Sequence, residues 1–163
     1  MTGFTCARCG SRHDELPMSY GAEAPAHWSP EFADDPNSEL GTDQCVIKGE
    51  HFFVRGIIPI PVRDTDTTFE WGAWVSVSQG SIAHMSERWH TEGRENSDPY
   101  FGWLSTELPG YPETVNLKTN VHTRPVGQRP VIELEPTDHP LAVEQRTGIT
   151  LARVQEIAEW LLH

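Results

Sequence analysis

The sequence predicts a single α+β domain: an antiparallel β-meander with one inserted helix, a C-terminal helical pair and an N-terminal zinc knuckle. Apolar residues alternate along the middle of the chain, as in strands, and recur at helical spacing near the C-terminus. The sequence contains no internal repeat, and its 163 residues are enough to bury one hydrophobic core. We therefore expect residues 1–163 to form one domain, on which residues 1–47 pack as a metal-knuckle and loop segment.

The N-terminal segment is expected to contain little regular structure. Phe4 and Cys6 alternate as in a short strand, and Gly10 permits a tight turn after it. Residues 15–43 are rich in proline, alanine, serine and acidic residues, a composition typical of loops. We expect this segment to run over the surface, with at most a short helical turn near residues 30–35.

The next segment predicts a β-hairpin. Residues 44–47 and 51–62 are strand-like, and the intervening Lys48-Gly49-Glu50 favours a turn. In the second strand, Pro59 and Pro61 have no backbone N–H, and both missing donors would point to the same side of the strand. This end of the strand is therefore predicted to lie at an edge of the sheet.

Residues 69–78 have the clearest strand pattern, and Trp74 falls on its polar side. Ser81 is expected to cap a helix that continues to about Gly93. Further strands are predicted at residues 100–108, 114–122 and 131–134, and further helices from Pro140 to near Gly148 and from the Thr150 cap to about Leu162.

Three cysteines and one histidine form a candidate metal site. Cys6 and Cys9 make a CxxC knuckle, His13 follows four positions later, and Cys45 opens the first long strand. Thiolates and imidazoles are the usual ligands of structural zinc, and a set of three cysteines and one histidine would fill a tetrahedral shell. Because a filled shell leaves no position for water, the sequence predicts structural rather than catalytic zinc.

Two other interpretations of the cysteines stay open. A CxxC pair can be a redox dithiol, although the strand–helix setting of thioredoxin-like motifs is not visible in this sequence. All three thiols can also be free and buried. Within the metal hypothesis, His51 or Asp14 could be the fourth ligand instead.

The charge balance restricts the classes of partner. The chain has 24 acidic and 12 basic residues, for a formal net charge of −12. A surface of this sign disfavours a nucleic-acid backbone and is compatible with a basic protein partner. No apolar run approaches the length of a membrane span, and the N-terminus lacks the pattern of a secretory signal peptide. We therefore expect a cytoplasmic protein without membrane association.

Signals of catalysis are weak. The sequence contains no nucleophile elbow, phosphate-binding loop or dinucleotide fingerprint. His139 follows Asp138, as a base follows its orienting carboxylate, but a helix entry explains this pair more simply.

The aromatic residues suggest a different role. If Trp74 shares a patch with Trp103 or Tyr111, that patch could be a recognition surface. The other interpretation is a second small core beneath the C-terminal helices.

Several short motifs recur together along the chain. They are Phe4-x-Cys6-x2-Cys9-Gly10-x2-His13, Leu16-Pro17, Asp43-x-Cys45-Val46-Ile47, Phe52-Phe53-x-Arg55-Gly56, Trp71-Gly72-x-Trp74-Val75-Ser76, Phe101-Gly102-Trp103-Leu104, Leu108-Pro109-x-Tyr111-Pro112 and His139-Pro140-Leu141-Ala142-x-Glu144-Gln145. This set resembles a bacterial family described only as domain of unknown function twenty-one ninety-nine, over nearly the whole chain. The resemblance implies a small, one-domain cytoplasmic protein and supports joint action of the three cysteines with His13. It implies no activity.

The sequence favours a non-enzymatic binding or accessory domain with structural zinc. Its acidic surface and aromatic-rich face would meet a protein partner. The alternative is a metal-dependent, hydrolase-like enzyme in which one ligand is absent and water occupies an open zinc site. Coordination distinguishes the two, because a complete shell of four protein ligands would exclude the enzyme.

Overall fold

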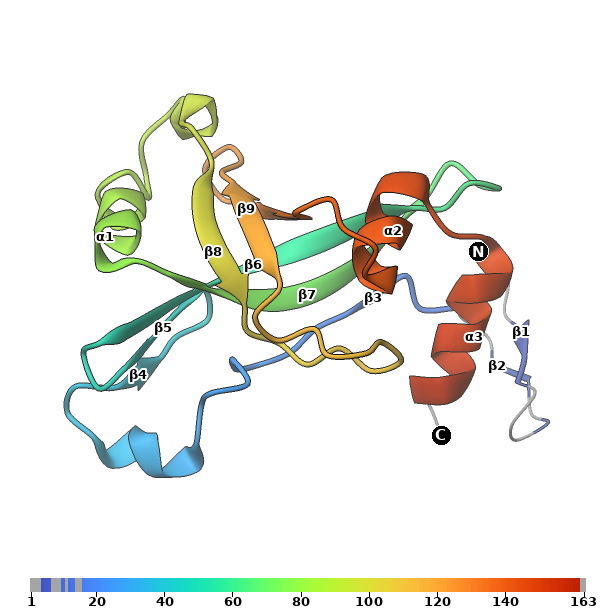
Figure 1. Cartoon of the computed structure of the whole chain (residues 1–163), viewed down its shortest axis with the longest axis horizontal. Helices are drawn as coiled ribbons and strands as arrows, with labels where there is room; N and C mark the ends of the chain where they lie inside the picture. Colours follow the sequence, from blue (N-terminus) through green and yellow to red (C-terminus); the bar gives the residue numbers. More distant parts are fainter. Residues whose placement is uncertain (1–3, 7–9, 11, 14–15, 162–163) are drawn as a thin grey trace.

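The computed structural model describes residues 4–6, 10, 12–13 and 16–161. It confirms the α+β class: a sheet closes on itself, with helices at both ends (Figure 1). The strands are β1 Phe4–Thr5, β2 Arg12–His13, β3 Ser19–Tyr20, β4 Glu39–Leu40, β5 Gln44–Ile47, β6 His51–Pro61, β7 Thr68–Val77, β8 Tyr100–Leu104, β9 Lys118–His122 and β10 Val131–Leu134. The helices are α1 Gln79–Glu87, α2 Pro140–Thr147 and α3 Leu151–Leu161, with 3-10 turns η1 Pro30–Asp34 and η2 Arg94–Asn96.

Strands β6 to β10 form a closed five-stranded barrel. Each strand pairs antiparallel with the next, and β10 returns to pair with β6 in parallel. Four successive reversals leave the first and fifth strands pointing the same way, so the closing pair has to be parallel. The predicted antiparallel meander is therefore corrected to a barrel, whose closure rests on the register pair Val131↔Ile57.

The seam between β6 and β10 is short because β6 ends in prolines. Ile57 donates its N–H to the carbonyl of Pro130 at 3.0 Å, and Pro59 and Pro61 follow without N–H donors. Beyond the seam, the α2 side chain Gln145 takes over: its amide donates to Ile132 O and accepts from Leu134 N, both at 2.8 Å. The predicted sheet edge thus corresponds to the place where a glutamine replaces a strand partner.

Short strands extend the barrel in the segment that was predicted to be loop. The antiparallel pair β4–β5 continues the sheet from β6, and β3 pairs in parallel with β7. Strands β1 and β2 pair only with each other within the described part of the chain. The prediction of loop for residues 15–43 was wrong at β3 and β4, because two residues carry no periodic pattern. The short strand expected at Phe4 is confirmed as β1, and the turn expected near residues 30–35 is confirmed as η1.

Two apolar clusters lie on opposite faces of β7. Trp71 and Val75 belong to the main core, which fills the barrel and continues under α2 and α3. Trp74 points the other way, is 0% exposed, and packs with Cys45, Ile47 and Phe53. Residues 22–32 cover this second cluster, and the carbonyl of Ala22 accepts a hydrogen bond from the Trp74 indole at 2.8 Å. A second small core therefore exists, but it does not lie beneath the C-terminal helices.

The helices begin and end at residues suited to those positions. Ser78, rather than the predicted Ser81, is the N-cap of α1, because its Oγ accepts the Ser81 N–H at 3.0 Å. The helix ends at Glu87, short of the predicted Gly93, which has φ +83° before η2. Gly148 ends α2 as predicted. None of the helices in the described residues has the length and apolar character required to span a bilayer.

Candidate functional site

The first half of the predicted metal site lies in a tight hairpin. The register of β1 and β2 pairs Phe4 with His13, and between them the N–H of Gly10 donates to Cys6 O at 2.8 Å. Gly10 has φ +74°, a conformation that glycine adopts readily. This backbone is compatible with a knuckle that brings two thiolates to one ion. Cys9 and the side chain of His13 lie outside the described residues.

The structure does not bring Cys45 to Cys6. Both thiols are buried, but Cys6 contributes to the main core and Cys45 to the second cluster, opposite Phe53 in the β5–β6 ladder. Strands β5 and β1 lie at opposite ends of the longest dimension of the molecule (Figure 1). The alternative ligand His51 begins β6 beside Ile47 of β5, so it lies apart from Cys6 as well.

The metal site therefore stays a prediction of the sequence. Among the residues that the structure describes, no three histidine, cysteine or acidic side chains are placed to hold a metal ion. Burial raises the pKa of the Cys45 thiol to about 11. A thiol in this environment is protonated at neutral pH, which makes it a poor ligand and a poor nucleophile.

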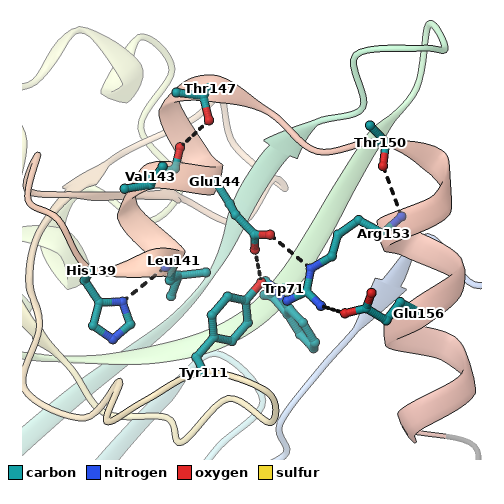
Figure 2. A network of polar contacts seen from close by, with 10 residues as sticks. All are labelled: Trp71, Tyr111, His139, Leu141, Val143, Glu144, Thr147, Thr150, Arg153 and Glu156. Carbon is teal, nitrogen blue, oxygen red and sulfur yellow. Dashed lines mark hydrogen bonds and ion pairs between the residues drawn. The ribbon is translucent and has the colours of Figure 1, made fainter.

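A polar network joins four segments at the end of the barrel where α2 and α3 lie (Figure 2). Glu144 of α2 accepts a hydrogen bond from the Tyr111 hydroxyl at 2.5 Å and pairs with Nε of Arg153, from α3, at 3.0 Å. The Trp71 indole of β7 donates to the same hydroxyl at 3.3 Å. Arg153 also lies over the Tyr111 ring, 5.6 Å from its centroid, and pairs with Glu156 at 2.6 Å.

The electrostatics of this network favour a structural role, in which it holds α2, α3 and the Tyr111 loop together. Burial, followed by the hydrogen bond to Glu144, raises the pKa of Tyr111 far above its ordinary value. Burial alone would lower the pKa of Arg153, but the charge of Glu144 and its hydrogen bond outweigh it and raise that pKa. Tyr111 and Arg153 are thus held in their ordinary protonation states, and each group already has its partner.

His139 has a structural role in the same region. Its Nδ1 accepts the N–H of Leu141 at 3.1 Å and so caps α2, while its Nε2 lies 2.9 Å from Pro112 O and 3.0 Å from Glu113 O. Both ring nitrogens are therefore engaged, with a proton on Nε2. The helix entry predicted for His139 is confirmed.

An aromatic face with an adjacent pocket lies on the outside of the barrel. Phe101 and Trp103 are 49% and 42% exposed, and their rings meet edge to face with centroids 5.2 Å apart. Beside them is a pocket of about 360 Å³, which we call the β8 pocket. Its floor and walls comprise Ile47, Phe53, Ser76, Ser105, His27, Phe32, Lys48, His51, Trp103 and Asn116.

The face differs from the patch considered in the sequence. Trp74 lies buried in the second cluster, and Tyr111 lies in the polar network, so Trp103 shares its surface with neither. Its exposed neighbour is Phe101, two residues earlier on β8. The pocket brings together residues from five separate segments of the chain, and for this reason no spacing in the sequence indicates it.

Fold and site together define an α+β barrel protein with an exposed aromatic face. The chain matches the family model described as "Uncharacterized protein conserved in bacteria (DUF2199)" over residues 5–149, and it belongs to that family. The resemblance seen in the sequence motifs is thereby confirmed. No curated protein and no solved structure matches the chain.

Proposed function

We propose that this chain is a non-enzymatic binding domain that recognises a protein partner through Phe101, Trp103 and the β8 pocket. The observation that carries the proposal is the exposed edge-to-face aromatic pair on β8, next to an open, partly apolar pocket. Large aromatic side chains that stand beside a pocket are typical anchors of protein interfaces. Strand β8 is hydrogen-bonded to neighbours on both sides, so the pair is presented from a rigid element.

Photocrosslinking tests this function directly. A benzoylphenylalanine at position 101 is expected to yield a discrete adduct with one partner protein in the bacterial cell, because the residue projects from the proposed interface. The same group at Val126, which is 42% exposed in the β9–β10 loop, is the matched control and should give no such adduct. Adding Trp103→Ala should abolish the adduct at 101. An adduct at position 126 alone, or one at 101 that survives Trp103→Ala, would assign recognition to another surface.

We further propose that a structural zinc is bound at the N-terminal hairpin by Cys6, Cys9 and His13, with Asp14, the next residue in the sequence, as the fourth ligand in place of Cys45. The tight Gly10 turn between the paired strands supports this set. Such a metal would fix the two ends of the knuckle and leave the barrel unchanged, because ligands in a turn this short constrain only the local chain.

Metal content tests the zinc proposal. Protein purified without added metal is expected to contain one zinc per chain, and Cys9→Ser should lose it. Cys45→Ala should keep the zinc, since Cys45 lies in the second cluster. Thermal unfolding of each variant confirms that it is folded. If Cys45→Ala loses the metal, Cys45 is a ligand; if the wild type binds none, the zinc site is excluded.

A further inference from the structure

The charge and shape of the β8 pocket specify the partner, and this inference rests on the proposed function. We infer that the pocket receives an acidic segment of the partner, with one apolar side chain inserted between Trp103 and Phe32. The sequence alone suggested a basic partner, because the whole chain is acidic. The pocket reverses that expectation locally.

The ionisable side chains that line the pocket are all basic. They are Lys48, His27 and His51, and no aspartate or glutamate joins them. The whole chain has 24 acidic residues beside 12 lysines and arginines and 8 histidines, so a lining with basic side chains and no carboxylate departs from the rest of the sequence. Lys118 adds a fourth basic group at the rim, with its Nζ 6.0 Å from the centre of the Trp103 ring. Carboxylates of a partner would find complementary charge at this site.

The apolar part of the pocket has a floor and walls suited to one inserted side chain. Phe53 and Ile47 form a buried floor, and the His27 ring stacks on Phe53 with centroids 5.9 Å apart. The Nζ of Lys48 lies 5.5 Å from the centre of the Phe32 ring, which places a cation at the mouth of an aromatic wall. An apolar residue flanked by carboxylates satisfies both features at once.

The backbone of the pocket is unusual in one respect. Two described residues other than glycine have positive φ, Lys48 at 56° and Asn116 at 76°, and both line this pocket. Side chains rarely adopt this conformation without a surrounding structure that holds it. Here it occurs at two lining residues that belong to two separate turns.

One acidic residue lies near Lys48 without lining the pocket. Asp35 is exposed and accepts hydrogen bonds from the Asn37 N–H and the Ser38 hydroxyl, which together with Lys48 lower its pKa. Its carboxylate accepts hydrogen bonds within its own turn and does not line the pocket. At physiological salt, charges more than roughly 8 Å apart are largely screened, so the groups lining the pocket determine its selectivity more than the net charge of the chain.

Three peptides measure this selectivity. Each is a heptapeptide with a central phenylalanine, flanked on both sides by three aspartates, three asparagines or three lysines. Binding is followed by amide and indole NMR shifts of Trp103 and Asn116 in 0.15 M salt. We expect the aspartate peptide to bind at least tenfold more tightly than the asparagine peptide, and the lysine peptide to bind most weakly. Lys48→Glu should remove the preference for aspartate, whereas Arg146→Glu, exposed on α2, should leave it unchanged.

The outcomes separate this inference from the proposed function. Equal affinity for aspartate and asparagine peptides, or tightest binding of the lysine peptide, would overturn the acidic partner while the aromatic face retained its role. If no peptide shifts Trp103 or Asn116, the pocket does not receive such a segment. The crosslink at position 101 then tests the protein-binding function separately. If Lys48→Glu does not fold, His51→Glu tests the same charge from the start of β6.

Discussion

Replacing Arg94 by methionine is expected to lower the free energy of unfolding by about 3 kcal/mol. Arg94 is 6% exposed, and its guanidinium donates four hydrogen bonds of 2.8–3.1 Å, all to backbone carbonyls. One acceptor is Trp89 and the other three are residues 124, 125 and 128, so the side chain fastens η2 to the β9–β10 loop. Methionine fills the volume but leaves these carbonyls without a donor.

Thermal unfolding gives the measurement, and a neighbouring arginine gives the control. For a chain of this length, a loss of 3 kcal/mol lowers Tm by roughly 6–12 °C. Arg88→Met should change stability by less than about 0.5 kcal/mol, because Arg88 is exposed and its guanidinium donates an exposed hydrogen bond to the Ser97 hydroxyl. Arg94→Lys should fall between the two, since one ammonium cannot reach carbonyls on both sides. Equal Tm values for the Arg94 and Arg88 methionine variants would show that Arg94 does not hold the loop.

The sequence predicted the elements whose pattern is long. Residues 69–78 alternate over their whole length, and the structure has β7 at Thr68–Val77. The missing donors of Pro59 and Pro61 likewise marked the place where the barrel seam ends. Closure of the barrel was not predictable in the same way, because it depends on sheet twist and on one register pair between residues 74 positions apart. Twist accumulates over the whole sheet and leaves no mark at any single position.

The candidate sites also differ in how far the sequence could predict them: features set by local spacing were predictable, and features set by the fold were not. Cys6 and Cys9 are close in the sequence, so spacing could suggest their partnership, whereas the place of Cys45 depends on which face of β5 it occupies. Trp74 was assigned to a polar face because its neighbours are small or polar, and only the fold reveals that residues 22–32 cover it. The sequence did not indicate that Arg94 is buried, since buried arginines are rare. Its acceptors are backbone carbonyls, which every residue type has, so no sequence pattern reveals them.

Glu144→Gln is expected to cost about 2 kcal/mol, because it leaves the half-buried Arg153 without the carboxylate that compensates its desolvation. Glu156→Gln is the matched control: it removes the other carboxylate of the same arginine, but Glu156 is 70% exposed, and the change should cost less than about 0.5 kcal/mol. Chemical denaturation at pH 7 compares the two. Equal losses would mean that Arg153 does not depend on its buried partner.

The last prediction concerns Tyr111, whose hydroxyl connects Glu144 with Trp71. Tyr111→Phe removes this hydroxyl and should cost about 1 kcal/mol at pH 8. Above pH 10 the difference should reverse. Burial and Glu144 hold the pKa of Tyr111 in the folded protein above its ordinary value, so the unfolded state loses its proton first. The wild type then loses stability by about 1.4 kcal/mol per pH unit above 10, and the phenylalanine variant is spared this loss.

At pH 11 the variant should therefore be at least as stable as the wild type. Titration of Cys45, whose pKa is also raised, is the same in both proteins and cancels from the comparison. Denaturant unfolding at pH 8 and pH 11 measures both differences. A constant difference between the two proteins would mean that the Tyr111 hydroxyl is accessible to solvent, and that the loop carrying it does not close over α2 and α3 as the network requires.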